Sequence, residues 1–332
     1  MMNTKRQIKT ARRQTGISLV EVMIAMLLGL LLMGGVMQVF ASSRQSYRVH
    51  DAVSRMQESG RMALEIISRD TRMADFWGCL SDTSTVVNNL NNAGAGFIDY
   101  AAGGIAGTEG AAGAPDTLIL SGGVNSGITI EPPFGPQASA NLKVAAGNGL
   151  AQDDIVFASD CSNGDIFQIS NANPSGAGTV VHNTGSGSPG NYNATNPGCP
   201  GANAHCLSKV YGGDASIFAV QQIVYTIGPG SEGQPALFRN GLELLDGIED
   251  LQILYGEDTD GSGVANYYVP ADQVVDMQNV ISVRFAIVAR SYDDNLTGGP
   301  AQNFVVLGAN AVAPDNRLRQ VYTSTVTVRN RL

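Results

Sequence analysis

An uncharged apolar run from Val22 to Phe40 constrains this chain more than any other feature of its sequence. At 1.5 Å per helical residue the run spans about 30 Å, which is enough to cross a bilayer once. The leader before it carries five basic residues and no acidic one: Lys5, Arg6, Lys9, Arg12 and Arg13. Because positively charged flanks stay in the cytoplasm, the sequence predicts one membrane-spanning helix followed by an exported domain.

The junction between leader and run, residues 16–21, differs from an ordinary secretory signal. Secretory signals place their small-residue cleavage site after the apolar region, whereas here Gly16 precedes it. Cleavage there would keep the apolar helix on the mature chain and make Ile17 its first residue. Glu21 would then lie at the head of that helix, where an unpaired carboxylate is costly in lipid. We expect it to pair with the free amine of Ile17 on a neighbouring subunit. The alternative is that Glu21 lies at headgroup level and favours the helix N-terminus electrostatically.

Beyond Phe40 the pattern becomes amphipathic. Apolar or small residues recur at spacings of three, four and seven: Val49, Val53, Met56, Gly60, Ala63, Ile67 and Ala74. The sequence therefore predicts one helix over 17–77, about 90 Å long if unbroken, which spans the membrane over about 20–41 and is amphipathic over about 44–77. Gly29, Gly34 and Gly35 are either points where the helix can bend or sites of close helix packing.

Residues 78–332 are predicted to form a β-rich domain. The candidate strands are Asp116–Ser121, Gly127–Glu131, Asp154–Ser159, Asp165–Ser170, Ser216–Ile227, Ala236–Arg239, Leu251–Tyr255, Val280–Arg290 and Gln320–Val328. No regular alternation of strands and helices appears, so we expect an α+β fold with a mainly antiparallel sheet on the long helix. Ala93–Pro115 and Asn183–Asn203, rich in glycine and small polar residues, are predicted to be long surface loops.

The charge distribution limits what this domain can bind. Between Met73 and Val283 the basic residues are Lys143, Lys209 and Arg239, against 21 acidic residues. Loss of the leader would change the formal net charge from −9 to about −14. Such an acidic surface argues against direct binding of nucleic acid and suits either solubility outside the cytoplasm, which is the favoured interpretation, or basic partners.

The four cysteines predict disulfides, because the domain is expected to be exported. Three pairings are possible. Cys199 and Cys206 are close in a Pro/Gly-rich loop and most simply pair with each other. Cys79, just past the helix end, would then pair with Cys161 and attach the helix to the sheet. Metal binding is the competing use, but there is no CxxC motif and only His205 lies nearby.

One loop resembles a calcium-binding sequence. Glu257-Asp-Thr-Asp-Gly-Ser-Gly263 places oxygen ligands at alternating positions, with Asn266 following. It lacks the third acidic position and the distal glutamate of an EF-hand, so a turn between strands is the favoured interpretation. If calcium binds, Asp258, Asp260 and Asn266 are the ligands we expect, and no other cofactor is predicted.

Nothing in the sequence predicts catalysis. It contains no GxSxG or HExxH motif, and the three histidines are scattered: His50, His182 and His205. We expect no enzyme activity.

The junction at Gly16 resembles that of the type IV prepilins, whose leader ends in glycine and whose mature chain carries glutamate at its fifth position. Ile17 stands where phenylalanine is commoner, and Gln38 stands where major pilins usually have proline, which favours a minor pilin. Further segments resemble the PilW family of minor pilins: Asp153–Cys161, Asp165–Ile169, Gly247–Gly261 and Val326–Arg331.

This resemblance implies a pilin-like fold, cleavage between Gly16 and Ile17 by the prepilin peptidase, and N-methylation of Ile17. It implies residence in the inner membrane, in contact with lipid and with the domain in the periplasm, before transfer to a pilus near its tip. The partners implied are other minor pilins, the major pilin and the inner-membrane assembly platform. The functions implied are priming of pilus assembly and support of twitching motility, adhesion or DNA uptake.

Two other interpretations remain open at this point. A pseudopilin of a type II secretion system shares the leader, the helix and a large β domain. A membrane-tethered periplasmic enzyme or binding protein would use the helix only as an anchor, which explains neither Gly16 nor Glu21.

Overall fold

The computed structural model describes residues 16–80, 83–100, 103–111, 113–135, 139–184, 187–192, 206–296 and 299–331. The chain divides into two compact units, residues 1–51 and residues 52–332. One helix of 55 residues, α1 (Leu19–Met73), contributes to both units. It is slightly shorter than the predicted 17–77. It ends where it does because Asp75 adopts a φ of 59° and donates its N–H to Ser121 O at 2.8 Å.

In the first unit, α1 exposes its apolar side chains. No residue of its most hydrophobic 18-residue window is buried, and its length and composition suffice to cross a membrane. The helix is continuous through Gly29, Gly34 and Gly35, where an added Cβ would meet nothing within 4 Å. Bending at these glycines and close packing against other helices therefore both stay predictions.

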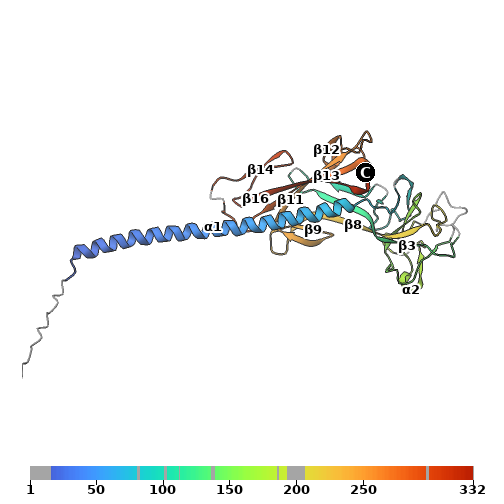
Figure 1. The fold of residues 1–332 in the computed structure, drawn as a ribbon, viewed down its shortest axis with the longest axis horizontal. Helices are drawn as coiled ribbons and strands as arrows, with labels where there is room; N and C mark the ends of the chain where they lie inside the picture. Colours follow the sequence, from blue (N-terminus) through green and yellow to red (C-terminus); the bar gives the residue numbers. More distant parts are fainter. Residues whose placement is uncertain are drawn as a thin grey trace, which may run out of the picture. The chain divides into compact units, whose positions relative to one another are not determined.

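The second unit contains two main sheets (Figure 1). The eight-stranded sheet has the order β1-β6-β5-β8-β3-β2, with β9 paired to β8 and β10 to β9, and only its β1–β6 pair is parallel. Its strands are β1 (Val86–Asn88), β2 (Ile105–Thr108), β3 (Thr117–Thr129), β5 (Ile155–Ser159), β6 (Gly164–Gln168), β8 (Ser216–Pro229), β9 (Pro235–Arg239) and β10 (Leu242–Asp246).

The four-stranded sheet is antiparallel throughout, in the order β12-β11-β13-β16. Its strands are β11 (Ile248–Glu257), β12 (Tyr267–Val269), β13 (Val280–Arg290) and β16 (Arg319–Thr327). Two small pairs complete the strands: β4 (Asn141–Lys143) with β7 (Thr179–Val181), and β14 (Asn303–Val306) with β15 (Ala309–Val312). The short helices are α2 (Pro174–Ala177) and the 3₁₀ turns η1 (Thr83–Thr85), η3 (Ala271–Gln273), η4 (Met277–Asn279) and η5 (Arg329–Arg331).

The predicted strands agree with this arrangement. β13 has the predicted bounds, and β16 differs from its prediction by one residue at each end. The side chains of β16 alternate between its two faces, since Val326 is buried while Thr323 and Thr325 are exposed. The predicted Gly127–Glu131 strand is instead the end of β3, which continues across a bulge between Val124 and Ile128.

The prediction that Ala93–Pro115 is entirely a surface loop is wrong. This segment contains β2, which pairs with β3 and buries Ile105 completely. Its glycines serve close packing, because a Cβ at Gly107 would lie 1.9 Å from the Tyr255 hydroxyl oxygen. Asn183–Asn203 lies largely outside the described residues.

The amphipathic half of α1 shares one core with both sheets. Met56, Ala63 and Ile67 are buried there against side chains from β3, β8, β9, β11, β13 and β16. A second core lies between β4–β7 and the β5–β6 end of the eight-stranded sheet, and a third surrounds Trp77. The long strand β8 contributes to all three: Tyr225 to the first, Ile217 to the second and Phe218 to the third.

Gly60 is the point of closest approach between α1 and β16. A Cβ at Gly60 would lie 2.2 Å from a ring carbon of Tyr322, whose hydroxyl donates to Met56 O at 3.2 Å. We expect Gly60→Ala to lower the free energy of unfolding by about 1–3 kcal/mol, as overpacking usually does.

The same change in a Tyr322→Ala background should instead raise the free energy of unfolding by roughly 1 kcal/mol, the helix-propensity gain of alanine over glycine. Urea unfolding of the detergent-solubilised chain, followed by the fluorescence of its single tryptophan, measures both effects. The same sign in both backgrounds would contradict this packing.

Candidate assembly helix and its attachment to the domain

The N-terminus of α1 is capped by residues of the junction. Ser18 immediately precedes the helix, and Glu21 Oε2 accepts a hydrogen bond from Ser18 N at 3.3 Å. Serine followed three residues later by glutamate is the spacing of a capping box. Ser18-Leu-Val-Glu21 carries that signal in the sequence, but our sequence analysis did not use it. Glu21 therefore has a partner within its own chain, and its pairing with the amine of a neighbouring Ile17 stays a prediction.

The first helical turns are exposed in the part of the chain that the structure describes. Ile17 and Leu19 are each 78% exposed, and the side chains from Val22 to Phe40 are exposed as well. Water is a poor environment for such a continuous apolar surface. This half of α1 therefore needs lipid or the helices of other subunits around it.

Asp70 joins the other half of α1 to the eight-stranded sheet. Its carboxylate accepts hydrogen bonds from the Tyr225 hydroxyl at 2.6 Å and from Arg239 Nε at 3.0 Å. Burial raises the pKa of Tyr225, and the hydrogen bond to Asp70 raises it further. Tyr225 therefore stays a neutral donor across the physiological pH range.

Asp75 organises the end of α1. Its Oδ1 accepts hydrogen bonds from Trp77 Nε1 at 2.7 Å and from Gly104 N at 2.6 Å. Its Oδ2 pairs with Arg331, and each of these two side chains is only 6% exposed. Arg331 also donates to Val280 O at 2.7 Å, and Asn330 donates to Ala74 O at 2.8 Å. One carboxylate thus joins the helix end, the residue before β2 and the segment after β16.

A disulfide joins Cys79 to Cys161, which confirms this predicted pairing. It connects the segment just after α1 to the turn between β5 and β6. Cys206 is also disulfide-bonded, whereas Cys199 lies outside the described residues, so the Cys199–Cys206 pairing stays a prediction.

A second buried carboxylate holds the segment that follows Cys206. Asp165, fully buried on β6, accepts hydrogen bonds from Asn89 Nδ2 at 2.8 Å, Ser208 N at 2.9 Å and the Tyr211 hydroxyl at 2.6 Å. Burial raises the pKa of Asp165, and these donors act against that shift. No local pattern in the sequence marks Asp70, Asp75 and Asp165 as attachment residues, because their partners are distant in the sequence.

The predicted calcium ligands lie in one loop after β11. Asp258 accepts from Gly263 N at 2.7 Å, and Asn266 Oδ1 accepts from Thr259 N at 2.7 Å. Asp260 accepts from Ser262 N at 3.0 Å and from Asn266 Nδ2 at 3.1 Å, and hydrogen bonds from these two residues lower its pKa to about 2. These oxygens cap the loop's own N–H groups, as in a turn between strands, and calcium binding stays a prediction.

Two family models match the chain. The prokaryotic N-terminal methylation motif matches residues 11–37, and the type IV pilus-assembly protein W model matches residues 224–330. The chain is a PilW-like, prepilin-type protein. Comparison with curated proteins and with solved structures gave no match.

In this PilW-like chain, one match covers the first part of α1, and the other covers strands that pack against the second half of α1. The methylation motif covers the junction and most of the apolar run, and the PilW match runs from the second half of β8 through β16. It includes the Gly247–Gly261 and Val326–Asn330 segments but not Asp153–Cys161. These matches support a minor pilin of a type IV pilus, a structural component that is processed by the prepilin peptidase, anchored in the membrane and assembled with other pilins.

Proposed function

We propose that this PilW-like pilin helps to prime type IV pilus assembly and remains at or near the pilus tip, in support of twitching motility, adhesion or DNA uptake. The observation that carries the proposal is the helix α1. Its N-terminal half has a prepilin-like junction and an apolar surface that is exposed among the described residues. Its other half is held to the domain by Asp70, and Asp75 holds the segment just after the helix.

The mechanism follows from the two environments of that helix. Before assembly, the apolar side chains of Val22–Phe40 contact lipid. In a growing fibre, they contact neighbouring helices, and exchange between two apolar media is close to isoenergetic and therefore reversible. Glu21 gives register by pairing with the amine of a neighbouring Ile17. No cofactor or substrate enters this mechanism.

A gene deletion tests the role in assembly. We expect the yield of sheared surface pili, seen by electron microscopy and protein gels, to fall in a strain that lacks the gene and to recover on complementation. Unchanged piliation would contradict the proposal and would move the assignment to a secretion pseudopilin, for which export of folded enzymes is the assay.

Two substitutions at Glu21 separate register from helix capping. Glutamine at this position can still accept the hydrogen bond from Ser18 N, but it carries no charge. We expect both Glu21→Gln and Glu21→Ala to be cleaved and methylated normally. Both should enter the fibre at least tenfold less than wild type, and a tenfold change corresponds to about 1.4 kcal/mol.

Quantitative immunoblots of membrane and sheared-pilus fractions measure this incorporation. Glu58→Ala, on an exposed position further along α1, is the matched control and should incorporate normally. If Glu21→Gln incorporates like wild type while Glu21→Ala does not, capping rather than charge pairing is the function of Glu21.

A further inference from the structure

β16 forms one edge of the four-stranded sheet, so one of its long sides has no hydrogen-bonded strand, although the β14–β15 hairpin packs against Val321 near its start. All nine of its residues pair with β13, from Ser282↔Thr327 to Arg290↔Arg319, without a bulge. In an antiparallel pair, alternate residues bond to the partner strand, and the others direct their N–H and C=O groups away from it.

The hydrogen bonds at the two ends of β16 show which residues point outward. Val328 N donates to Ile281 O at 2.8 Å and so continues the bonded series on the β13 side. Arg319 directs its N–H and C=O to the side chain of Gln302, at 2.8 Å for each bond. The odd-numbered residues therefore face away from β13, and Gln302 already occupies the first outward position.

Four residues continue this outward edge: Val321, Thr323, Thr325 and Thr327. Within the described part of the chain, their outward N–H and C=O groups have no hydrogen-bond partner. We name Val321–Thr327 the open edge. The side chain of Tyr322, within the open edge, lies against α1, and its hydroxyl donates a hydrogen bond to Met56 O. β16 runs beside the helix in Figure 1.

The open edge lacks the features that normally prevent strand addition. Natural edge strands are short, or carry lysine, proline or a bulge. The sequence Val321-Tyr-Thr-Ser-Thr-Val-Thr327 has no lysine and no proline and pairs regularly. The other sheet edges in the described residues are shorter: β1 and β12 have three residues each, β2 has four, and β10 has five with a bulge.

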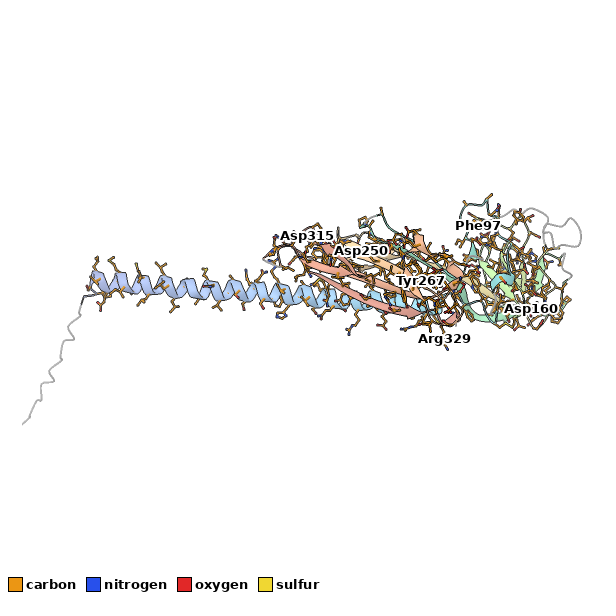
Figure 2. All side chains as sticks on the ribbon, turned by 90° about the horizontal axis from the view of Figure 1, so that it is seen from above. Phe97, Asp160, Asp250, Tyr267, Asp315 and Arg329 are labelled. Atoms are coloured by element: carbon orange, nitrogen blue, oxygen red, sulfur yellow. A yellow bond between two sulfur atoms is a disulfide. The ribbon has the colours of Figure 1, made fainter. Side chains whose placement is uncertain are left out.

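We propose that the open edge pairs with an extended strand of a different pilin-class subunit. This proposal rests on the proposed function, because it takes a second pilin as the partner. Main-chain hydrogen bonds to the outward residues would give affinity, as in other cases of strand addition. Of the four arginines in the segment 316–331, Arg317, Arg319 and Arg331 form ion pairs with acidic residues of the same chain. Arg329, labelled beyond one end of β16 in Figure 2, is exposed and favours an acidic residue on the partner strand.

The direction of the helix argues against a second copy of this chain as the partner. β16 runs in the same direction as α1, since Tyr322 bonds to Met56 and Asn330 bonds to Ala74. Antiparallel pairing of two β16 strands would make the two Ala52–Met73 helices point in opposite directions. Two such chains could not enter one membrane from the same side. Parallel pairing of two copies would keep their helices aligned, but parallel ladders are slightly less stable per residue, whereas a different subunit with another strand direction can pair antiparallel.

Photo-crosslinking in cells tests the open edge. We place a benzoylphenylalanine at Thr323 of the full chain, and at the 83% exposed Val275 as a control away from the edge. We expect the Thr323 probe, but not the Val275 probe, to give a crosslinked product that mass spectrometry identifies as another pilin.

Proline at an outward position blocks this pairing without removing a main-chain bond to β13, because its missing N–H faced away from that strand. At Thr325 it also removes the side-chain hydrogen bond that Arg284 Nε donates to the Thr325 hydroxyl at 3.1 Å. We therefore expect Thr325→Pro to reduce the Thr323 crosslink about tenfold, the effect of a lost hydrogen bond whose partner stays unsatisfied. Thr325→Ser, which keeps the N–H, should leave it unchanged. Normal abundance and an intact Cys79–Cys161 disulfide on non-reducing gels confirm that each variant folds.

Three results would overturn the proposal: no pilin crosslink at Thr323, a crosslink only to a second copy of this chain, or a crosslink that Thr325→Pro does not reduce. The proposed function fails separately. Suppose that piliation is normal after gene deletion, but that Thr323 still gives a crosslink to a pilin-class subunit and Thr325→Pro reduces it. The proposal of strand pairing at the open edge would then stand, and the proposed role in pilus priming would be rejected.

Discussion

Replacing Asp75 by asparagine is expected to lower the free energy of unfolding by about 3–5 kcal/mol, the cost of leaving one charge of a buried ion pair without its partner. Asparagine has nearly the same shape and tolerates the φ of 59° at this position, so the backbone turn after α1 should persist. The loss comes from Arg331, which is 6% exposed and would keep only its backbone acceptors.

Urea unfolding followed by tryptophan fluorescence measures this loss directly, because Trp77 donates to Asp75 and is the single tryptophan of the chain. Arg329→Ala is the matched control. Arg329 is exposed two residues before Arg331, and its removal should change the free energy of unfolding by less than about 0.5 kcal/mol. Equal effects of the two variants would show that Asp75 does not hold the helix end.

Removal of the Cys79–Cys161 disulfide has the second large expected effect. The bridge spans 82 residues, and the chain-entropy model gives a loss of about 4 kcal/mol for a loop of this size. Cys79→Ser, Cys161→Ser and the double variant should all lose the same amount, because any one of them removes the whole crosslink.

The same fluorescence assay applies to these variants, since Trp77 lies in the core beside the bridge and its ring contacts Phe157 of β5 at 5.2 Å between centroids. Ser162→Ala, on an exposed residue next to Cys161, should unfold like wild type. A double variant that lost about twice as much as either single variant would mean that the serines act by some route other than the crosslink.

Local patterns in the sequence predicted much of this fold. The apolar run and the stripe from Val49 to Ala74 predicted α1, and the strand predicted over 320–328 matches β16 to within one residue at each end. The bounds of β13 were predicted correctly because a run rich in β-branched and apolar residues lies between the polar residues Asn279 and Ser291. The Cys79–Cys161 pair followed from the position of one cysteine past a helix end and the other between two strands.

Long-range features could not be predicted in this way. The division of the strands into two sheets depends on which strands pair across about 100 residues, as β3 does with β8. The sequence did not predict β2, because its glycines indicate a loop. Only the structure shows that the Tyr255 side chain lies beside Gly107. Asp75 has no local signal either, because its partner Arg331 lies at the other end of the domain sequence. In contrast, the capping of α1 by Ser18 and Glu21 was readable from their spacing alone.

The disulfide also sets how mechanical load passes through the domain. Without it, tension between α1 and the β5–β6 hairpin would reach that hairpin along a long stretch of chain whose ladder hydrogen bonds can open in turn. With it, the covalent path from the last residue of α1 to Cys161 consists of the few residues up to Cys79 and one S–S bond. A pulled chain would therefore transmit force to that end of the domain before any strand separates, and its extension under load would stay small until the remaining ladders yield.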